Sequence, residues 1–130
     1  MFCKKSVVVF LTTFVLVGCG YRDADDYARQ VQQHMPLNWS VRAYYDTTRT
    51  WEAPKILTVE ATSNQYKVVA SRSPQTGDIK SSCYINSILH MVFEDGLERR
   101  HPKRPAVSVD VEIGLVNGSQ QLIKAMQMVR

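Results

Sequence analysis

The feature that most limits what this chain can fold into is the apolar run near its start. Residues 6–17 are 12 in number, uncharged and mostly apolar, and they follow Lys4 and Lys5. A helix that crosses a bilayer needs about 20 apolar residues, so this run is too short to span one. A basic start and a short apolar core are typical of a secretory signal. We therefore expect this segment to be cleaved, and not to be a buried strand or helix, because no polar face interrupts it.

The run ends on four residues that resemble the lipobox of bacterial lipoproteins. Leu16, Val17, Gly18 and Cys19 match its pattern of leucine, a small or β-branched residue, glycine or alanine, and cysteine. The resemblance implies that residues 1–18 are a signal peptide and that Cys19 carries a diacylglycerol thioether and an acylated amino group. At about 0.8 kcal/mol per buried methylene, several acyl chains form a stable membrane anchor. This covalent lipid is the only cofactor that we expect.

The residue after the cysteine bears on the location of the protein. In many Gram-negative lipoproteins an aspartate at that position retains the protein at the inner membrane, whereas this chain has Gly20. The resemblance therefore implies an outer-membrane protein that is lipid-anchored and faces the periplasm or the cell surface.

Removal of the signal changes the size, the charge and the cysteine count of the chain. Residues 19–130 suffice for a single lipid-anchored globular domain. The formal charge falls from +4 to +2, with 14 Lys and Arg against 12 Asp and Glu, so we expect no nucleic-acid partner. Cys3 is lost and Cys19 is lipidated, which leaves Cys83 alone in the mature chain. We expect Cys83 to be a small buried hydrophobe.

Hydrophobic periodicity predicts one helix followed by three strands. Residues 23–35 have apolar side chains at helical spacing and aspartates in the first turn, where the helix dipole favours negative charge, and Pro36 ends the segment. Alternation of apolar and polar residues predicts strands over 39–45, 56–62 and 66–72, of which the last two form a hairpin.

Residues 81–95 fit two structures. The apolar residues Ile85, Ile88, Leu89 and Val92 recur at i, i+3, i+4 and i+7, with serines before them and a glycine after them as possible caps. This pattern predicts a helix. A single strand over residues 83–93 is the alternative, since it would place Ile85, Leu89, Met91 and Phe93 on one side.

The C-terminal segment is predicted to be a β-hairpin. Residues 107–115 alternate between apolar and polar, and Asn117-Gly118, the strongest two-residue hairpin signal, follows them. A turn at this dipeptide would bring the apolar faces of two strands into the same register. The alternative is a helix over 119–129, whose apolar residues also fit helical spacing.

These elements together predict one α+β domain. We expect a curled antiparallel sheet or a cracked β-barrel of about five strands, with an N-terminal helix and one packed helix.

No combination of residues predicts a catalytic or metal site. The three histidines are far apart in sequence, and the phosphate-binding and nucleophile motifs are absent. We therefore predict a protein that is not an enzyme. The charge cluster in residues 98–105 is a candidate loop for an anionic partner in the envelope; its cations are Arg99, Arg100, Lys103 and Arg104.

Two segments resemble those of the type III secretion pilotins, small lipoproteins that bind and localise a secretin ring. They are residues 85–96, a predicted helix that ends in Asp-Gly, and the predicted hairpin at Asn117-Gly118. The resemblance implies a cracked β-barrel whose groove takes the C-terminal segment of a secretin, and it assigns no functional residue. We therefore expect a non-catalytic protein that binds an envelope protein such as a secretin. The alternative is an inhibitor or immunity-type lipoprotein that blocks a toxin or lytic enzyme, through loop 46–54 or loop 98–105.

Overall fold

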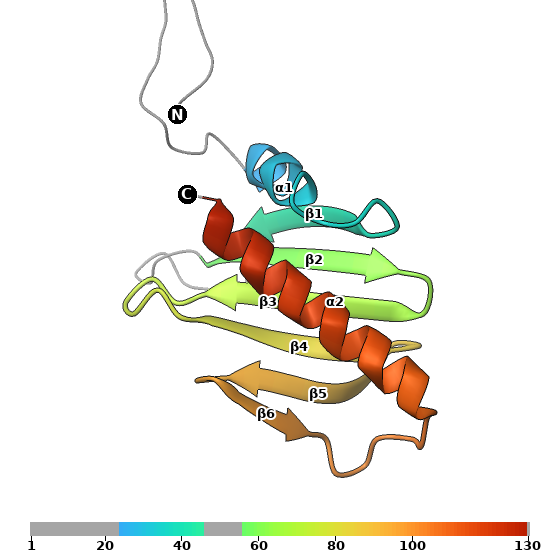
Figure 1. Cartoon of the computed structure of the whole chain (residues 1–130). Helices are drawn as coiled ribbons and strands as arrows, with labels where there is room; N and C mark the ends of the chain where they lie inside the picture. The colour runs from blue at the N-terminus through green and yellow to red at the C-terminus, as the bar shows by residue number, and fades with distance from the viewer. Residues whose placement is uncertain (1–23, 46–55, 130) are drawn as a thin grey trace, which may run out of the picture.

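A computed structural model describes residues 24–45 and 56–129 of the chain. The elements in this part are α1 (Ala24–Gln32), β1 (Ser40–Tyr45), β2 (Leu57–Ser63), β3 (Tyr66–Arg72), β4 (Ile79–Ile85), β5 (Ile88–Glu94), β6 (Leu97–Arg100) and α2 (Val109–Met128). The strands form one six-stranded antiparallel sheet in chain order. The predicted α+β class is confirmed, but the sheet has six strands and does not close into a barrel (Figure 1).

Both helices lie on the same face of the sheet. α2 crosses the strands diagonally and α1 lies beside β1, whereas no described helix or strand covers the opposite face (Figure 1). The core is therefore a single layer between the sheet and the helices. Its fully buried side chains include Val31, Val59, Val68, Met91 and Leu122.

α1 confirms the prediction of an N-terminal helix. Its apolar face is buried, and Asp25 and Asp26 lie in its first turn. Gln32 at its end donates a hydrogen bond to the Trp39 carbonyl at 2.8 Å and accepts one from the Val41 amide at 2.9 Å. α1 therefore covers the outer edge of β1, and a partner strand could not pair there without displacing Gln32.

The helix predicted over residues 81–95 is wrong, and the alternative of one strand over 83–93 is correct in type only, because a turn divides this range into two strands. β4 and β5 form an antiparallel hairpin joined by Asn86 and Ser87, which have φ angles of 50° and 69°. Asp95 and Gly96, at 55° and 75°, form the turn to β6. Two-residue hairpin turns with positive φ match the twist of the strands, and Asp-Gly favours them. The glycine that suggested a helix cap is therefore a hairpin residue.

The hairpin predicted around residues 117–118 is also wrong. Residues 109–128 form one helix, capped by Ser108, whose hydroxyl accepts a hydrogen bond from the Val111 amide at 3.3 Å. The alternative helix over 119–129 was correct in type but ten residues too short at its start. A Cβ atom on Gly118 would lie 2.3 Å from Cζ2 of Trp39, so this glycine permits close packing rather than a turn.

Cys83 is confirmed as a buried residue with a free thiol. Burial raises the pKa of Cys83, although hydrogen bonds to Ser119 and Ser81 partly oppose the rise. The two serines also bond each other at 3.0 Å between their hydroxyl oxygens. This buried polar group joins β4 to the middle of α2 and explains how α2 tolerates a serine on its inner face.

Candidate functional site

The predicted lipobox lies outside the described residues. This applies to Leu16, Val17, Gly18 and Cys19, and the structure therefore leaves the anchor as a prediction. The candidate loop 46–54 also lies outside the described residues.

The four predicted cations of loop 98–105 do not form one surface. Arg100 donates to Glu98 at 2.8 Å and to Glu112 of α2 at 3.0 Å, and Arg104 lies 3.7 Å from the same Glu112 carboxylate. The sequence had suggested that Glu112 belongs to the solvated face of a strand. Instead it lies on α2 and joins the β6–α2 connection to the helix, so two of the four cations are neutralised within the protein.

The other two cations of the loop point to different parts of the surface. Arg99 is exposed and pairs with Val92 of β5, on the face of the sheet away from the helices. Lys103 is exposed in the connection to α2. Neither forms an ion pair with the residues that the structure describes. The candidate loop is therefore divided between the two sides of the sheet.

His90 is the residue in this region that sequence reasoning did not select. It is fully buried at the irregular pairing of β4 with β5, where one extra residue is accommodated on β5. Neither ring nitrogen has a hydrogen-bond partner within the described chain. Burial lowers the pKa of His90, the charge of Glu112 opposes this shift and the charge of Arg104 adds to it. Burial thus favours the neutral form of the His90 imidazole.

This burial predicts a loss of stability in mild acid. Since the folded pKa of His90 lies below the unfolded value of about 6.5, the unfolded state binds the proton first as the pH falls. The free energy of unfolding should therefore decrease below about pH 6.5, by up to about 1.4 kcal/mol per pH unit, and level off below the folded pKa. Urea titrations at pH 7.5, 6.5, 5.5 and 4.5 measure this slope.

The variant His90→Leu isolates the contribution of this side chain. Because leucine removes both unpartnered nitrogens, we expect a flatter dependence on pH and no large loss of stability at pH 7.5. The exposed His34 provides the control His34→Gln, which should keep the slope of the parent protein. An equally steep slope in His90→Leu would contradict the assignment.

The uncovered face of the sheet brings together residues from every strand. Directly paired residues of antiparallel strands share a face, and the register defines three neighbouring rows on this one. The longest row is Arg42, Glu60, Val69, Ser82, Val92 and Arg99. The row on one side of it is Ser40, Thr62, Lys67, Tyr84 and Leu89, and the row on the other side is Tyr44, Thr58, Ser71 and Lys80. These rows alternate with the buried residues that face the helices.

A network around Glu60 stabilises one end of this face. Glu60 is 7% exposed and accepts hydrogen bonds from the Tyr44 hydroxyl at 2.7 Å and from Arg42 at 3.1 Å. Burial acts to raise the pKa of Glu60, but these bonds and the charges of Arg42 and Lys67 outweigh it and lower the pKa. The Glu60 charge is therefore neutralised where β1 and β2 meet.

The centre of the face differs from an ordinary solvated surface. Val69, Leu89 and Val92 are half-buried and do not belong to the core cluster. Lys67 lies over the ring of Tyr84, with its ammonium 5.8 Å from the ring centroid. We call the six residues of this region the sheet patch: Lys67, Val69, Tyr84, Leu89, Val92 and Arg99. Val69 is the sign of this patch in the sequence, because it is an apolar residue on the polar side of the strand predicted over residues 66–72.

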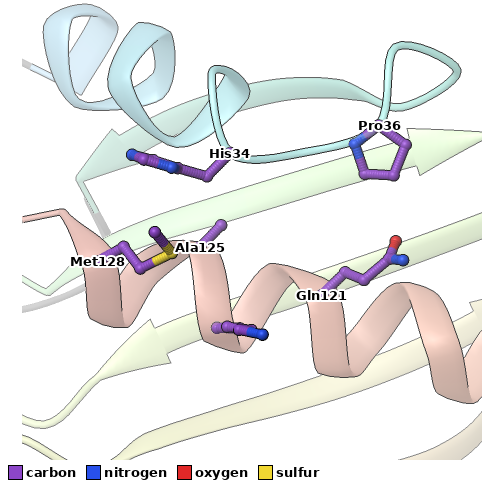
Figure 2. Close-up of a pocket in the computed structure, with 6 residues that line it drawn as sticks. His34, Pro36, Gln121, Ala125 and Met128 are labelled. Carbon is purple, nitrogen blue, oxygen red and sulfur yellow. The ribbon is translucent and has the colours of Figure 1, made fainter.

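A separate hollow lies between the turn after α1 and the outer side of α2. Its volume is about 420 Å³, and its lining residues are His34, Pro36, Gln121, Lys124, Ala125 and Met128 (Figure 2). All of them except Ala125 are exposed. The hollow is therefore an open depression, unlike the enclosed, mainly apolar pockets that bury most of a small ligand.

The described residues show neither a metal-binding group nor a membrane-crossing helix. Across residues 24–45 and 56–129, no three His, Cys, Asp or Glu side chains are placed to hold a metal ion. No helix in these same ranges is long and apolar enough to cross a bilayer. Comparison with known proteins gave no match to a family model, to a curated protein or to a solved structure.

Proposed function

We propose that this chain is a non-catalytic, lipid-anchored protein of the bacterial outer membrane that binds a protein partner. The observation that carries the binding role is the sheet patch, an apolar and aromatic surface with cations on a face that no described element covers. Protein interfaces are enriched in aromatic and arginine side chains around an apolar centre. The anchor is supported by the lipobox pattern that ends at Cys19.

The anchor and the fold together suggest how the patch would be presented. Five residues lead from Cys19 to Ala24, and an extended chain spans at most about 3.6 Å per residue, so α1 would lie within about 18 Å of the anchor. β6 lies five strand spacings from β1, or about 24 Å. The sheet patch, on β3 to β6, would thus lie on the part of the domain that is farther from the anchor.

A role as a pilotin or assembly factor for a secretion-system outer-membrane component is a narrower form of this proposal. The two segments that resemble pilotins do not support it, because residues 85–96 form strands and Asn117-Gly118 lies within a helix. Its support is the lipobox pattern and the sheet patch. The alternative is an inhibitor or immunity-type lipoprotein. Of its two candidate loops, residues 98–105 are held against α2 by Glu112, which favours the sheet patch over a protruding loop.

The anchor is tested by the variant Cys19→Ser. In a Gram-negative host supplied with an alkyne-labelled palmitate, we expect the parent protein to carry the label and to sediment with the outer membrane. Cys19→Ser should lose the label and leave the membrane fraction, because the acyl chains provide the attachment. Cys83→Ser is the matched control and should behave as the parent does. Equal labelling of Cys19→Ser and the parent would refute the anchor.

The binding surface is tested by a photo-crosslinking amino acid at Val92, compared with the same residue at Gln120 on the exposed side of α2. We expect a discrete cross-linked protein from position 92 and none from position 120. Equal cross-linking from the two positions, or none from position 92, would refute the sheet patch as the binding surface.

A further inference from the structure

We propose that the sheet patch binds an acidic segment of a partner protein, whose apolar side chains cover Val69 and Val92 and whose carboxylates pair with Lys67 and Arg99. This inference rests on the proposed function and specifies the chemistry of the partner. It follows from the apolar centre of the patch, from its unpaired cations and from the distance between them.

The apolar centre lies in the middle of the sheet. Val69 and Val92 flank Ser82 on the three central strands, and the Tyr84–Leu89 pair lies in the next row. On most surface strands these positions would be polar, since one face of an antiparallel sheet is usually solvated. The two valines, the leucine and the tyrosine around Ser82 instead provide apolar area that a partner can bury.

The acidic side chains of this face pair with cations outside the patch, which leaves Lys67 and Arg99 available. Arg42 is paired with Glu60, and Lys80 lies 3.7 Å from Glu94. Lys67 and Arg99 form no ion pair with any described residue, although the charge of Lys67 acts on Glu60 from a distance. Both carboxylates of the face are therefore occupied by neighbouring cations. An incoming acidic group finds two cations without an opposing charge, which is the complementarity that selects a partner.

The register sets the spacing that the partner must match. Lys67 is on β3 and Arg99 is on β6, about 14 Å apart across three strand spacings and about 7 Å apart along the strands, which together give about 16 Å. The patch lies between them. In a helix with a rise of 1.5 Å per residue and 3.6 residues per turn, two acidic residues eleven positions apart span about 16 Å and lie on the same face. We therefore expect a segment that crosses the strands, with apolar residues in the middle and acidic residues on both sides.

The probe for this inference is a fluorescein-labelled helical peptide of 18 residues with leucines in the middle of one face and glutamates eleven residues apart on that face. Two matched peptides carry glutamine or lysine in place of the glutamates. Fluorescence anisotropy with the full-length lipoprotein in a non-ionic detergent, at 50 mM salt, measures binding. We expect the glutamate peptide to bind about tenfold more tightly than the glutamine peptide, and this difference to shrink at 300 mM salt, where charges are screened.

Variants of the protein locate the binding. The double variant Lys67→Gln/Arg99→Gln should lose about tenfold in affinity for the glutamate peptide. Lys124→Gln is the matched control, since Lys124 is an exposed cation on α2 that forms no ion pair with any residue that the structure describes. It should change the affinity less than twofold. Equal binding of the glutamate and glutamine peptides, or equal losses in Lys124→Gln and the double variant, would overturn the inference.

Two further outcomes separate this inference from the proposed function. Suppose that the cross-linked product from position 92 forms in full yield when the protein carries Lys67→Gln/Arg99→Gln. The sheet patch is then still the binding surface, but the acidic partner is refuted. If vesicles of phosphatidylglycerol, and not the glutamate peptide, bind in a manner that depends on Lys67 and Arg99, the patch recognises lipid and the inference is also refuted. Loss of the cross-link in the double variant, with the cross-link kept in Lys124→Gln, supports it.

Discussion

Gly118→Ala is expected to lower the free energy of unfolding by about 1–3 kcal/mol. The new Cβ atom would lie 2.3 Å from Cζ2 and 2.5 Å from Cη2 of Trp39, distances that real contacts do not reach. Trp39 is 6% exposed and its ring stacks on Tyr66 with centroids 6.2 Å apart, so the indole has little room to move. Overpacking of this kind typically costs 1–3 kcal/mol, and part of it is offset by the helix propensity of alanine, about 1 kcal/mol above that of glycine. Urea titration at pH 7.5 measures the difference.

Asn117→Ala is the matched control for this substitution. Asn117 is exposed on the same helical turn, so alanine should stabilise the protein by a few tenths of a kcal/mol through helix propensity. A hairpin would respond in the opposite way, since its turn needs asparagine for a positive φ. The second variant Trp39→Phe shortens the ring that would collide with the new methyl group. In that background Gly118→Ala should cost much less, and an unchanged cost would refute the packing explanation.

Arg72→Met is expected to lower the free energy of unfolding by about 2 kcal/mol. Nη2 of Arg72 donates to the Met126 carbonyl in the last turn of α2 at 2.7 Å, and the side chain is half-buried. The Met126 carbonyl otherwise accepts only a long hydrogen bond, from the Val129 amide at 3.4 Å, so the Arg72 cation adds a shorter bond and opposes the negative end of the helix dipole. Hydrogen bonds to charged groups contribute about 1.5–3 kcal/mol. Arg72 also hydrogen-bonds Tyr27 of α1, so it connects both helices to β3.

The control for Arg72→Met is Arg29→Met. Arg29 is exposed and pairs with Asp26 at 3.2 Å on the surface of α1, and such pairs contribute at most about 1 kcal/mol. Arg72→Lys, which keeps the charge but has a shorter reach, should lie between the parent and Arg72→Met. Hydrogen exchange adds a spatial test, because the amides in the last turn of α2 should lose protection in Arg72→Met. Equal losses of stability in the two arginine-to-methionine variants would contradict the role of Arg72.

The first half of the domain could be predicted from local pattern. α1, β1, β2 and β3 lie within one to three residues of their predicted ends, because each buries one face against a single neighbouring layer. The period of the apolar residues therefore reports the structure directly. The hairpin of β4 and β5 was harder to predict. The apolar residues on both sides of its turn happen to recur at helical spacing over residues 85–92.

The candidate site was predicted only in part. The cations at 99–104 were visible as a cluster, but the pairing of Arg100 and Arg104 with Glu112 depends on a helix that the sequence pattern presented as a strand. The sheet patch could not be assembled without the strand order, since its residues come from β3 to β6. The apolar segment 84–93 indicates a core or edge position for His90, but its burial without a hydrogen-bond partner depends on the bulge in β5.

The sequence by itself determined the strong local signals: the predicted anchor at Cys19, the amphipathic α1 and the alternation of the first three strands. Only the tertiary structure decided the role of Asn117-Gly118. In an isolated peptide this dipeptide favours a turn by at most a few kcal/mol, and burial of Leu115, Leu122 and Met126 against the sheet favours a helix by more. The glycine lies in that helix because Trp39, almost eighty positions earlier, needs the space that a side chain would occupy.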